Sequence, residues 1–102
     1  MPGPLEGLGG LGLGTRMAAS FCAGLLGEQG AEVIKIEQPD TGDFMREIGP
    51  FVPDKGDSDS HGYSLFWAVE GRGRSSVTLN LRKPEGQDLF RRLAETADVV
   101  VE

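Results

Sequence analysis

The chain is poor in the residue types that build several common kinds of site. Its 102 residues include one cysteine and one histidine, and aromatic residues make up 7%. Cys22 has no second cysteine for an internal disulfide, and His61 has no second histidine or nearby cysteine for a zinc site. No apolar run is long enough to span a membrane, and the chain does not begin with a basic and then apolar signal segment. We therefore expect a soluble protein of the reducing cytoplasm, without a membrane partner.

Basic residues are also scarce. Ten Lys and Arg stand against sixteen Asp and Glu, which gives a formal net charge of −6. This balance argues against a nucleic-acid partner, because such partners require a basic surface. The length allows one small domain, residues 1–102, and no second lobe.

Residues 30–39 are central to the predicted fold. Val33, Ile34 and Ile36 form a β-branched run between a glycine and a proline, which is typical of a strand. Because the run is nearly continuous, it favours a parallel strand that is covered on both faces. Glu37 is then expected at the carboxyl end of this strand, where open α/β sheets bind ligands.

A helix is predicted before this strand, from about residue 16 to residue 29, with Thr15 as its N-cap. Its apolar face is expected to carry Met17, Ala18, Phe21, Cys22, Leu25 and Leu26. Because Cys22 lies on this face, we interpret it as a buried hydrophobe rather than as a nucleophile.

The second half of the chain alternates further strands and helices. A short helix near residues 63–69 is expected to pack Phe66 and Trp67 on the sheet, and Pro84 begins a longer helix. The inner face of that helix is predicted to comprise Leu89, Phe90, Leu93 and Ala97. Strands are predicted where Val77, Leu79 and Leu81 alternate with polar residues, and at residues 99–101. This order predicts an α/β fold with a largely parallel, Rossmann-like sheet and flanking helices.

The segment from residue 40 to residue 62 has no sustained periodicity and is predicted to be a long loop with one turn near residues 44–48. A loop of this length is usually a binding loop or a lid, or else it is disordered. Its acidic residues, Asp54, Asp57 and Asp59, lack the glycine and the terminal glutamate of a calcium loop. We therefore expect no metal site here, and we interpret His61 as a surface residue.

Two features indicate anion binding. Gly7, Gly9 and Gly12 fit the G-x-G-x-x-G pattern of dinucleotide-binding folds, with Glu37 as a ribose ligand, although a convincing strand before the first glycine is missing. Arg72 and Arg74 alternate with glycines, which suits close approach to phosphate. An NAD(P)-binding domain and a non-enzymatic anion-binding module are therefore the alternatives to the interpretation that follows.

The longest motifs carry a resemblance to a known family. The runs FCAGLLGEQGAEVIKIEQPDTGDFMREIGP and RGRSSVTLNLRKPEGQDLFRRLAETADVVVE resemble the opening of the family III coenzyme A transferases. This family includes formyl-CoA transferases, carnitine CoA-transferases and α-methylacyl-CoA racemases. The resemblance implies the N-terminal part of a larger acyl-CoA-processing enzyme, truncated at Glu102 and inactive alone. The catalytic aspartate would lie beyond residue 102, and the complete protein would form an interlaced homodimer.

The resemblance also implies a site for the nucleotide part of coenzyme A. Acyl-CoA would be a substrate together with a carboxylic acid acceptor, and no cofactor would be bound permanently. The implied binding residues are Arg16, Met17, Gln38, Arg72, Arg74, Leu79, Leu81 and Arg82. Within this chain the resemblance implies no catalytic residue.

Overall fold

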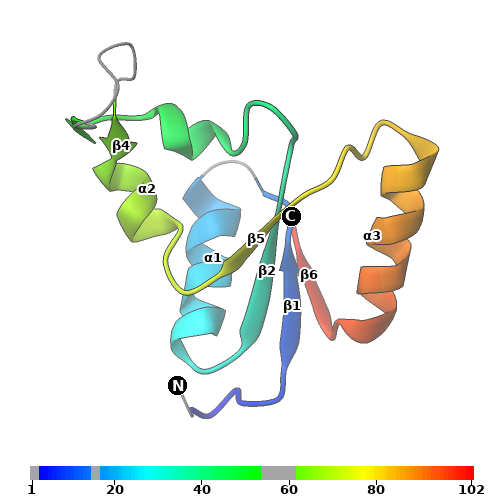
Figure 1. Cartoon of the computed structure of the whole chain (residues 1–102). Coiled ribbons are helices and arrows are strands. Elements are labelled where there is room, and N and C mark those ends of the chain that lie inside the picture. Colours follow the sequence, from blue (N-terminus) through cyan, green and yellow to red (C-terminus); the bar gives the residue numbers. More distant parts are fainter. Residues whose placement is uncertain (1–2, 15–16, 54–61) are drawn as a thin grey trace.

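The computed structural model describes residues 3–14, 17–53 and 62–102, in which strands and helices alternate (Figure 1). The strands are β1 (Gly9–Gly12), β2 (Glu32–Glu37), β3 (Phe51–Val52), β4 (Tyr63–Ser64), β5 (Ser75–Thr78) and β6 (Val99–Val101). The helices are α1 (Met17–Glu28), the short 3₁₀ helix η1 (Phe44–Glu47), α2 (Leu65–Glu70) and α3 (Pro84–Thr96). This order confirms the predicted α/β class.

Within the described ranges, the main sheet has the strand order β5-β2-β1-β6, and every pair in it is parallel. In the centre of β1, Leu11 aligns with Ile34 on one side and with Val100 on the other. The predicted strand at residues 30–39 is confirmed as β2, and Gly30 before it has a φ of 104°. That conformation favours glycine and ends the preceding helix.

Strand β1 consists largely of glycine, which is unfavourable in isolation. Its position between β2 and β6 supplies hydrogen-bond partners along both edges and overrides this weak propensity. Gly9 and Gly12 therefore lie inside a strand rather than in a turn after one. The dinucleotide fingerprint through Gly7, Gly9 and Gly12 was consequently the wrong interpretation, because that motif needs its glycines between the strand and the helix.

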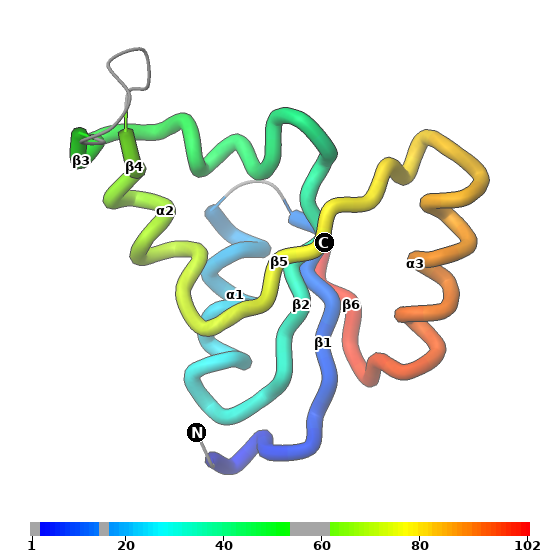
Figure 2. The backbone as a smooth tube through the Cα atoms, viewed as in Figure 1, coloured from blue at the N-terminus to red at the C-terminus, as the bar shows by residue number. Residues whose placement is uncertain are grey.

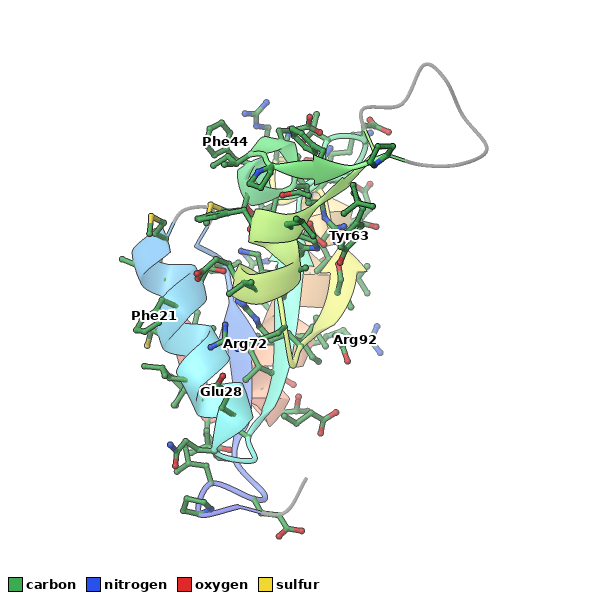
Figure 3. All side chains as sticks on the ribbon, turned by 90° about the vertical axis from the view of Figure 1, so that its left-hand side faces the viewer. Phe21, Glu28, Phe44, Tyr63, Arg72 and Arg92 are labelled. Atoms are coloured by element: carbon green, nitrogen blue, oxygen red, sulfur yellow. The ribbon has the colours of Figure 1, made fainter. Side chains whose placement is uncertain are left out.

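Helices cover both faces of the sheet. With the view turned by 90°, α1 and α2 lie in front of the sheet and α3 lies behind it (Figure 3). Helix α1 approaches β1 closely, since a Cβ built on Gly12 would lie 3.7 Å from the Cβ of Ala23. The core between α1 and the sheet comprises Ala23, Ala31 and Val33, with Leu5, Leu8 and Leu26 packed against them.

The face that α1 buries differs from the predicted one. Its buried residues are Ser20, Ala23 and Gly24, whereas Phe21 is 52% exposed and Cys22 is exposed. Small side chains let the helix backbone approach the sheet, so the large apolar residues at spacings of four point outward. The interpretation of Cys22 as a core residue was therefore wrong. Its proposed N-cap, Thr15, lies outside the described residues.

Three further predictions are corrected in the second half of the chain. Helix α2 packs mainly on η1 and α1, whereas the sheet was predicted as its partner, and it buries Trp67. Strand β5 ends at Thr78, so Leu79 and Leu81 follow the strand instead of alternating within it. Helix α3 begins at Pro84 as predicted, but Leu89 is exposed and Ala97 lies one residue past the helix end.

The predicted loop at residues 40–62 contains η1 and β3. Strand β3 pairs antiparallel with β4, which follows this loop. Asp54, Asp57, Asp59 and His61 lie outside the described residues. Among the residues that the structure describes, no helix has the length and apolar character needed to cross a membrane.

Candidate functional site

The candidate site lies at the carboxyl edge of the sheet. In a parallel sheet the segments that follow the strands gather at one edge, and Figure 2 shows the C-terminus of β6 at this same edge. A cavity of about 160 Å³ opens there between the segments after β1, β2 and β5. It is lined by Leu13, Ile36, Glu37, Gln38, Leu79, Asn80, Leu81 and Arg82.

The segment after β5 forms one wall of this cavity, and main-chain hydrogen bonds fix it. The Leu79 amide donates to the Glu37 carbonyl at 3.0 Å, which continues the sheet pairing past Thr78. The Arg82 amide donates to Asn80 Oδ1 at 3.1 Å. A Cβ built on Gly86 would lie only 2.0 Å from the Asn80 carbonyl oxygen, so the first turn of α3 presses against this wall. The wall is therefore fixed by β2 on one side and by the first turn of α3 on the other.

A second cavity of about 290 Å³ lies beside the first and shares Ile36, Glu37 and Gln38 with it. Its other lining residues are Thr41, Gly42, Asp43, Phe44 and Glu47. The exposed Gln38 begins the turn of residues 38–42, in which the Gly42 amide donates to the Gln38 carbonyl at 2.9 Å. Gln38 thus borders both cavities.

Glu37 connects the wall and the turn, and its buried carboxylate pairs with the partly exposed Arg46. Arg46 donates from Nε to Glu37 Oε1 and from Nη2 to Oε2, each at 2.7 Å, and the Asp43 amide donates to Oε1 at 2.8 Å. The Ser76 hydroxyl of β5 also donates to Oε2. These donors, first of all Arg46, lower the pKa of Glu37 to about 2. We call Glu37, Asp43, Arg46 and Ser76 the Glu37 cluster.

An ion pair in which both side chains are buried lies next to this cluster. Lys35 Nζ is 2.8 Å from Asp43 Oδ2, and the two side chains are 3% and 0% exposed. Lys35 also donates to the Gly14 carbonyl after β1, while Asp43 Oδ1 accepts the Met45 amide and caps η1. The pair therefore joins the segment after β1 to the segment after β2.

Arg46 has a second role on the outer side of the cluster. Its guanidinium carbon lies 4.3 Å from the centre of the Trp67 ring, within the range of a cation–π contact. Ser64 caps α2 by accepting the Trp67 amide at 3.1 Å, and it also donates to the Ile48 carbonyl. Helix α2 and η1 therefore support the Glu37 cluster from outside.

The structure places the described members of the predicted binding set in three parts of the fold. Gln38, Leu79, Leu81 and Arg82 line the first cavity together. Met17 is exposed on the first turn of α1, and Arg16 lies outside the described residues.

Arg72 and Arg74 lie before β5, at the opposite end of that strand from the cavity. Arg72 Nε is 2.6 Å from Glu28 Oε1 at the end of α1, a contact between residues labelled in Figure 3. Arg74 Nη1 donates to Ser20 Oγ at 3.1 Å, and its buried Nη2 has no hydrogen-bond partner within the described ranges. Burial lowers the pKa of Arg74. Both arginines thus contact α1.

Reasoning from the sequence missed Lys35 and Asp43 and did not find the partners of Glu37. A signal was present, because two charged residues in a strand covered on both faces must be paired. Asp43 lies eight residues after Lys35, and Arg46 lies nine residues after Glu37.

A parallel sheet with helices on both faces defines an open α/β domain, and cavities at the carboxyl ends of the strands are where such domains usually bind ligands. Residues 5–102 match the family described as CoA-transferase family III. The chain therefore belongs to CoA-transferase family III, as the resemblance indicated.

Related proteins of known structure or function share this region. The chain is 44% identical over 101 residues to a succinyl-CoA–D-citramalate CoA-transferase of Chloroflexus aurantiacus, covering 99% of this chain and 23% of that protein. It is 37% identical over 100 residues to a human succinyl-CoA:glutarate CoA-transferase, covering 97% of this chain and 21% of that protein. A CAIB/BAIF family protein from Brucella suis superimposes with a TM-score of 0.84 at 36% identity, covering 98% of this chain and 25% of that one. The chain thus spans about a quarter of the length of these relatives.

Proposed function

We propose that this chain supplies the coenzyme A nucleotide site of an acyl-CoA:carboxylate CoA-transferase. The observation that carries the proposal is the cavity at the carboxyl edge, where Gln38, Leu79, Leu81 and Arg82 meet. Leu79 and Leu81 offer apolar surface for a flat base, Gln38 offers amide hydrogen bonds, and Arg82 offers a cation for phosphate.

The size of the cavity supports a partial site. About 160 Å³ is less than the roughly 300 to 1,000 Å³ of cavities that enclose whole drug-sized ligands. Coenzyme A is larger than such a ligand, so the cavity suits one ring system of it, with the remainder passing over Gln38 or into solvent.

The substrates follow from the family and its named relatives. The relatives from Chloroflexus aurantiacus and human are named as CoA-transferases of succinyl-CoA, which supports a transferase over a racemase. The substrates would be an acyl-CoA and a carboxylic acid acceptor, with no permanently bound cofactor. The catalytic aspartate would come from sequence beyond residue 102, the active enzyme would be a cytoplasmic, interlaced homodimer, and this chain alone would be inactive.

Among the described residues that the resemblance implies, Met17, Arg72 and Arg74 do not line the cavity, and Arg16 lies outside the described residues. Arg16 and Met17 would approach the ligand from the start of α1. Arg72 and Arg74 would need to exchange their present contacts with Glu28 and Ser20 for phosphate. Their contact with coenzyme A therefore stays a prediction.

Calorimetric titration of the chain with coenzyme A, NAD and inorganic phosphate tests the proposal. We expect coenzyme A to bind more tightly than either alternative. Arg82→Met should weaken coenzyme A binding about tenfold, because a charge-assisted hydrogen bond contributes roughly 1.5 to 3 kcal/mol. Arg91→Met is the matched control, since Arg91 is exposed on α3 away from the cavity and pairs only locally with Asp88. Equal binding of all three ligands, or equal losses in both variants, would refute the assignment.

A further inference from the structure

Glu37 holds two walls of the candidate site at once. Its carbonyl accepts the Leu79 amide at 3.0 Å, which fixes the start of the wall formed by residues 79–82. Its carboxylate accepts the Asp43 amide at 2.8 Å, which fixes the far end of the turn of residues 38–42. One residue therefore sets the separation between these two segments.

The turn itself depends on this attachment. Asp40 and Gly42 have positive φ angles of 72° and 69°, a conformation that is unfavourable for Asp40. Within the turn, the Thr41 amide donates to the Pro39 carbonyl and the Gly42 amide to the Gln38 carbonyl, each at 2.9 Å. These contacts lie within the turn and do not fix its orientation relative to the sheet. That orientation is fixed at the end of the turn, where Asp43 contacts Glu37 and Lys35.

Three neighbouring segments within the described ranges supply hydrogen-bond donors to the Glu37 carboxylate. Arg46 faces it from η1, Ser76 from β5 and the Asp43 amide from the loop, while Lys35 on its own strand pairs with Asp43. Glu37 lines both cavities, but its side chain is only 2% exposed and therefore offers a ligand little contact surface of its own. A buried carboxylate that accepts this many hydrogen bonds is rigid, and it transmits that rigidity to the backbone that it holds.

We propose that Glu37 is a positioning residue for the nucleotide site, which fixes Gln38 and the turn of residues 38–42 against the wall of residues 79–82. The inference rests on the proposed function, because it assigns Glu37 a role in the same site. Arg46 acts through Glu37, since its bidentate pair orients the carboxylate toward the Asp43 amide.

Three variants separate positioning from general stability. Glu37→Gln keeps the length of the side chain but removes its charge. Arg46→Lys keeps the charge but loses the bidentate geometry, and Arg46→Met loses both. Val33→Ala is the matched control, because Val33 is buried in the amino-terminal half of β2 and lines neither cavity. It should lower the unfolding midpoint without disturbing the turn.

The first measurement is the affinity for coenzyme A by calorimetry, alongside the unfolding midpoint of each variant. We expect Glu37→Gln to bind coenzyme A about tenfold more weakly than the parent chain, and Val33→Ala to stay within about twofold of it. Arg46→Met should bind coenzyme A more weakly than Arg46→Lys does. If the affinity of all four variants simply followed their unfolding midpoints, Glu37 would have only a structural role and the proposal would be overturned.

The second measurement does not use a ligand. Amide hydrogen exchange, followed residue by residue by NMR, should show exchange at residues 40–43 at least tenfold faster in Glu37→Gln than in the parent chain. In Val33→Ala the amides of residues 40–43 should change no more than the amides of β2 do. If the parent chain failed to bind coenzyme A, the proposed function would be refuted. Amide hydrogen exchange at residues 40–43 would still show whether Glu37 orders the turn. Unchanged exchange at residues 40–43 would overturn the positioning role.

Discussion

Acid should weaken the folded chain through Glu37, and the Glu37→Gln variant isolates this effect. In the folded chain the pKa of Glu37 is lowered from 4.5 to about 2, first by the hydrogen bonds from Arg46 and then by those from Ser76 and Asp43. A lowered pKa in the folded state means that the stabilisation is fully present above the unfolded pKa. It is lost as the pH falls from about 5 towards 2.

The size of the effect follows from the same shift. One pKa unit corresponds to about 1.4 kcal/mol, so the full shift would contribute about 3 kcal/mol. The Arg46 side chain is 38% exposed, and solvent screens its interaction with Glu37. We therefore expect about 2 kcal/mol.

Urea unfolding between pH 7 and pH 2 measures this contribution. The parent chain should be more stable than Glu37→Gln by a constant amount above pH 5, and the difference should shrink by about 2 kcal/mol on the way to pH 2. Glu95→Gln, which changes an exposed carboxylate on α3, is the control and should follow the parent chain throughout. Parallel curves for the parent chain and Glu37→Gln would refute the reasoning, because Glu37 would then not titrate differently on folding.

Three further outcomes follow from particular contacts. Lys35→Met should lower the free energy of unfolding by about 3 to 5 kcal/mol, because it leaves the buried Asp43 carboxylate without its cation, and a loss under 1 kcal/mol in urea unfolding would contradict the buried pair. Gly86→Ala should cost about 1 to 3 kcal/mol in the same assay, since its Cβ would lie 2.0 Å from a carbonyl oxygen, whereas Gly12→Ala should be tolerated because its nearest contact is 3.7 Å. Cys22 should react with Ellman's reagent about as fast in the native chain as in urea, and strong native protection would restore its interpretation as a core residue.

The sequence predicted best the elements whose signals are local. Gly30 and Pro39 bracket β2, and Pro84 begins α3, because a positive φ and a missing amide act within a few residues. Strand β1 could not be predicted with the same certainty, since a glycine-rich strand depends on β2 and β6 on its two sides. Its partners follow it by 20 residues or more.

The burial of α1 and of the charged pairs was harder to predict for a related reason. Hydrophobic spacing favoured Phe21, whereas close packing on β1 selected Ala23 and Gly24 for their small size. Lysine and glutamate are seldom fully buried, so Lys35 and Glu37 are expected at a surface until their partners are known. Those partners, Asp43 and Arg46, are contributed by a loop whose path local patterns do not specify.

The central claim is that coenzyme A binds at the carboxyl edge of this sheet, and NMR with isotopically labelled chain tests it most directly. On titration with coenzyme A, we expect the largest amide shifts at Gln38 and at residues 79–82. Shifts confined to Arg72 and Arg74, or no shifts at saturating coenzyme A, would contradict the claim.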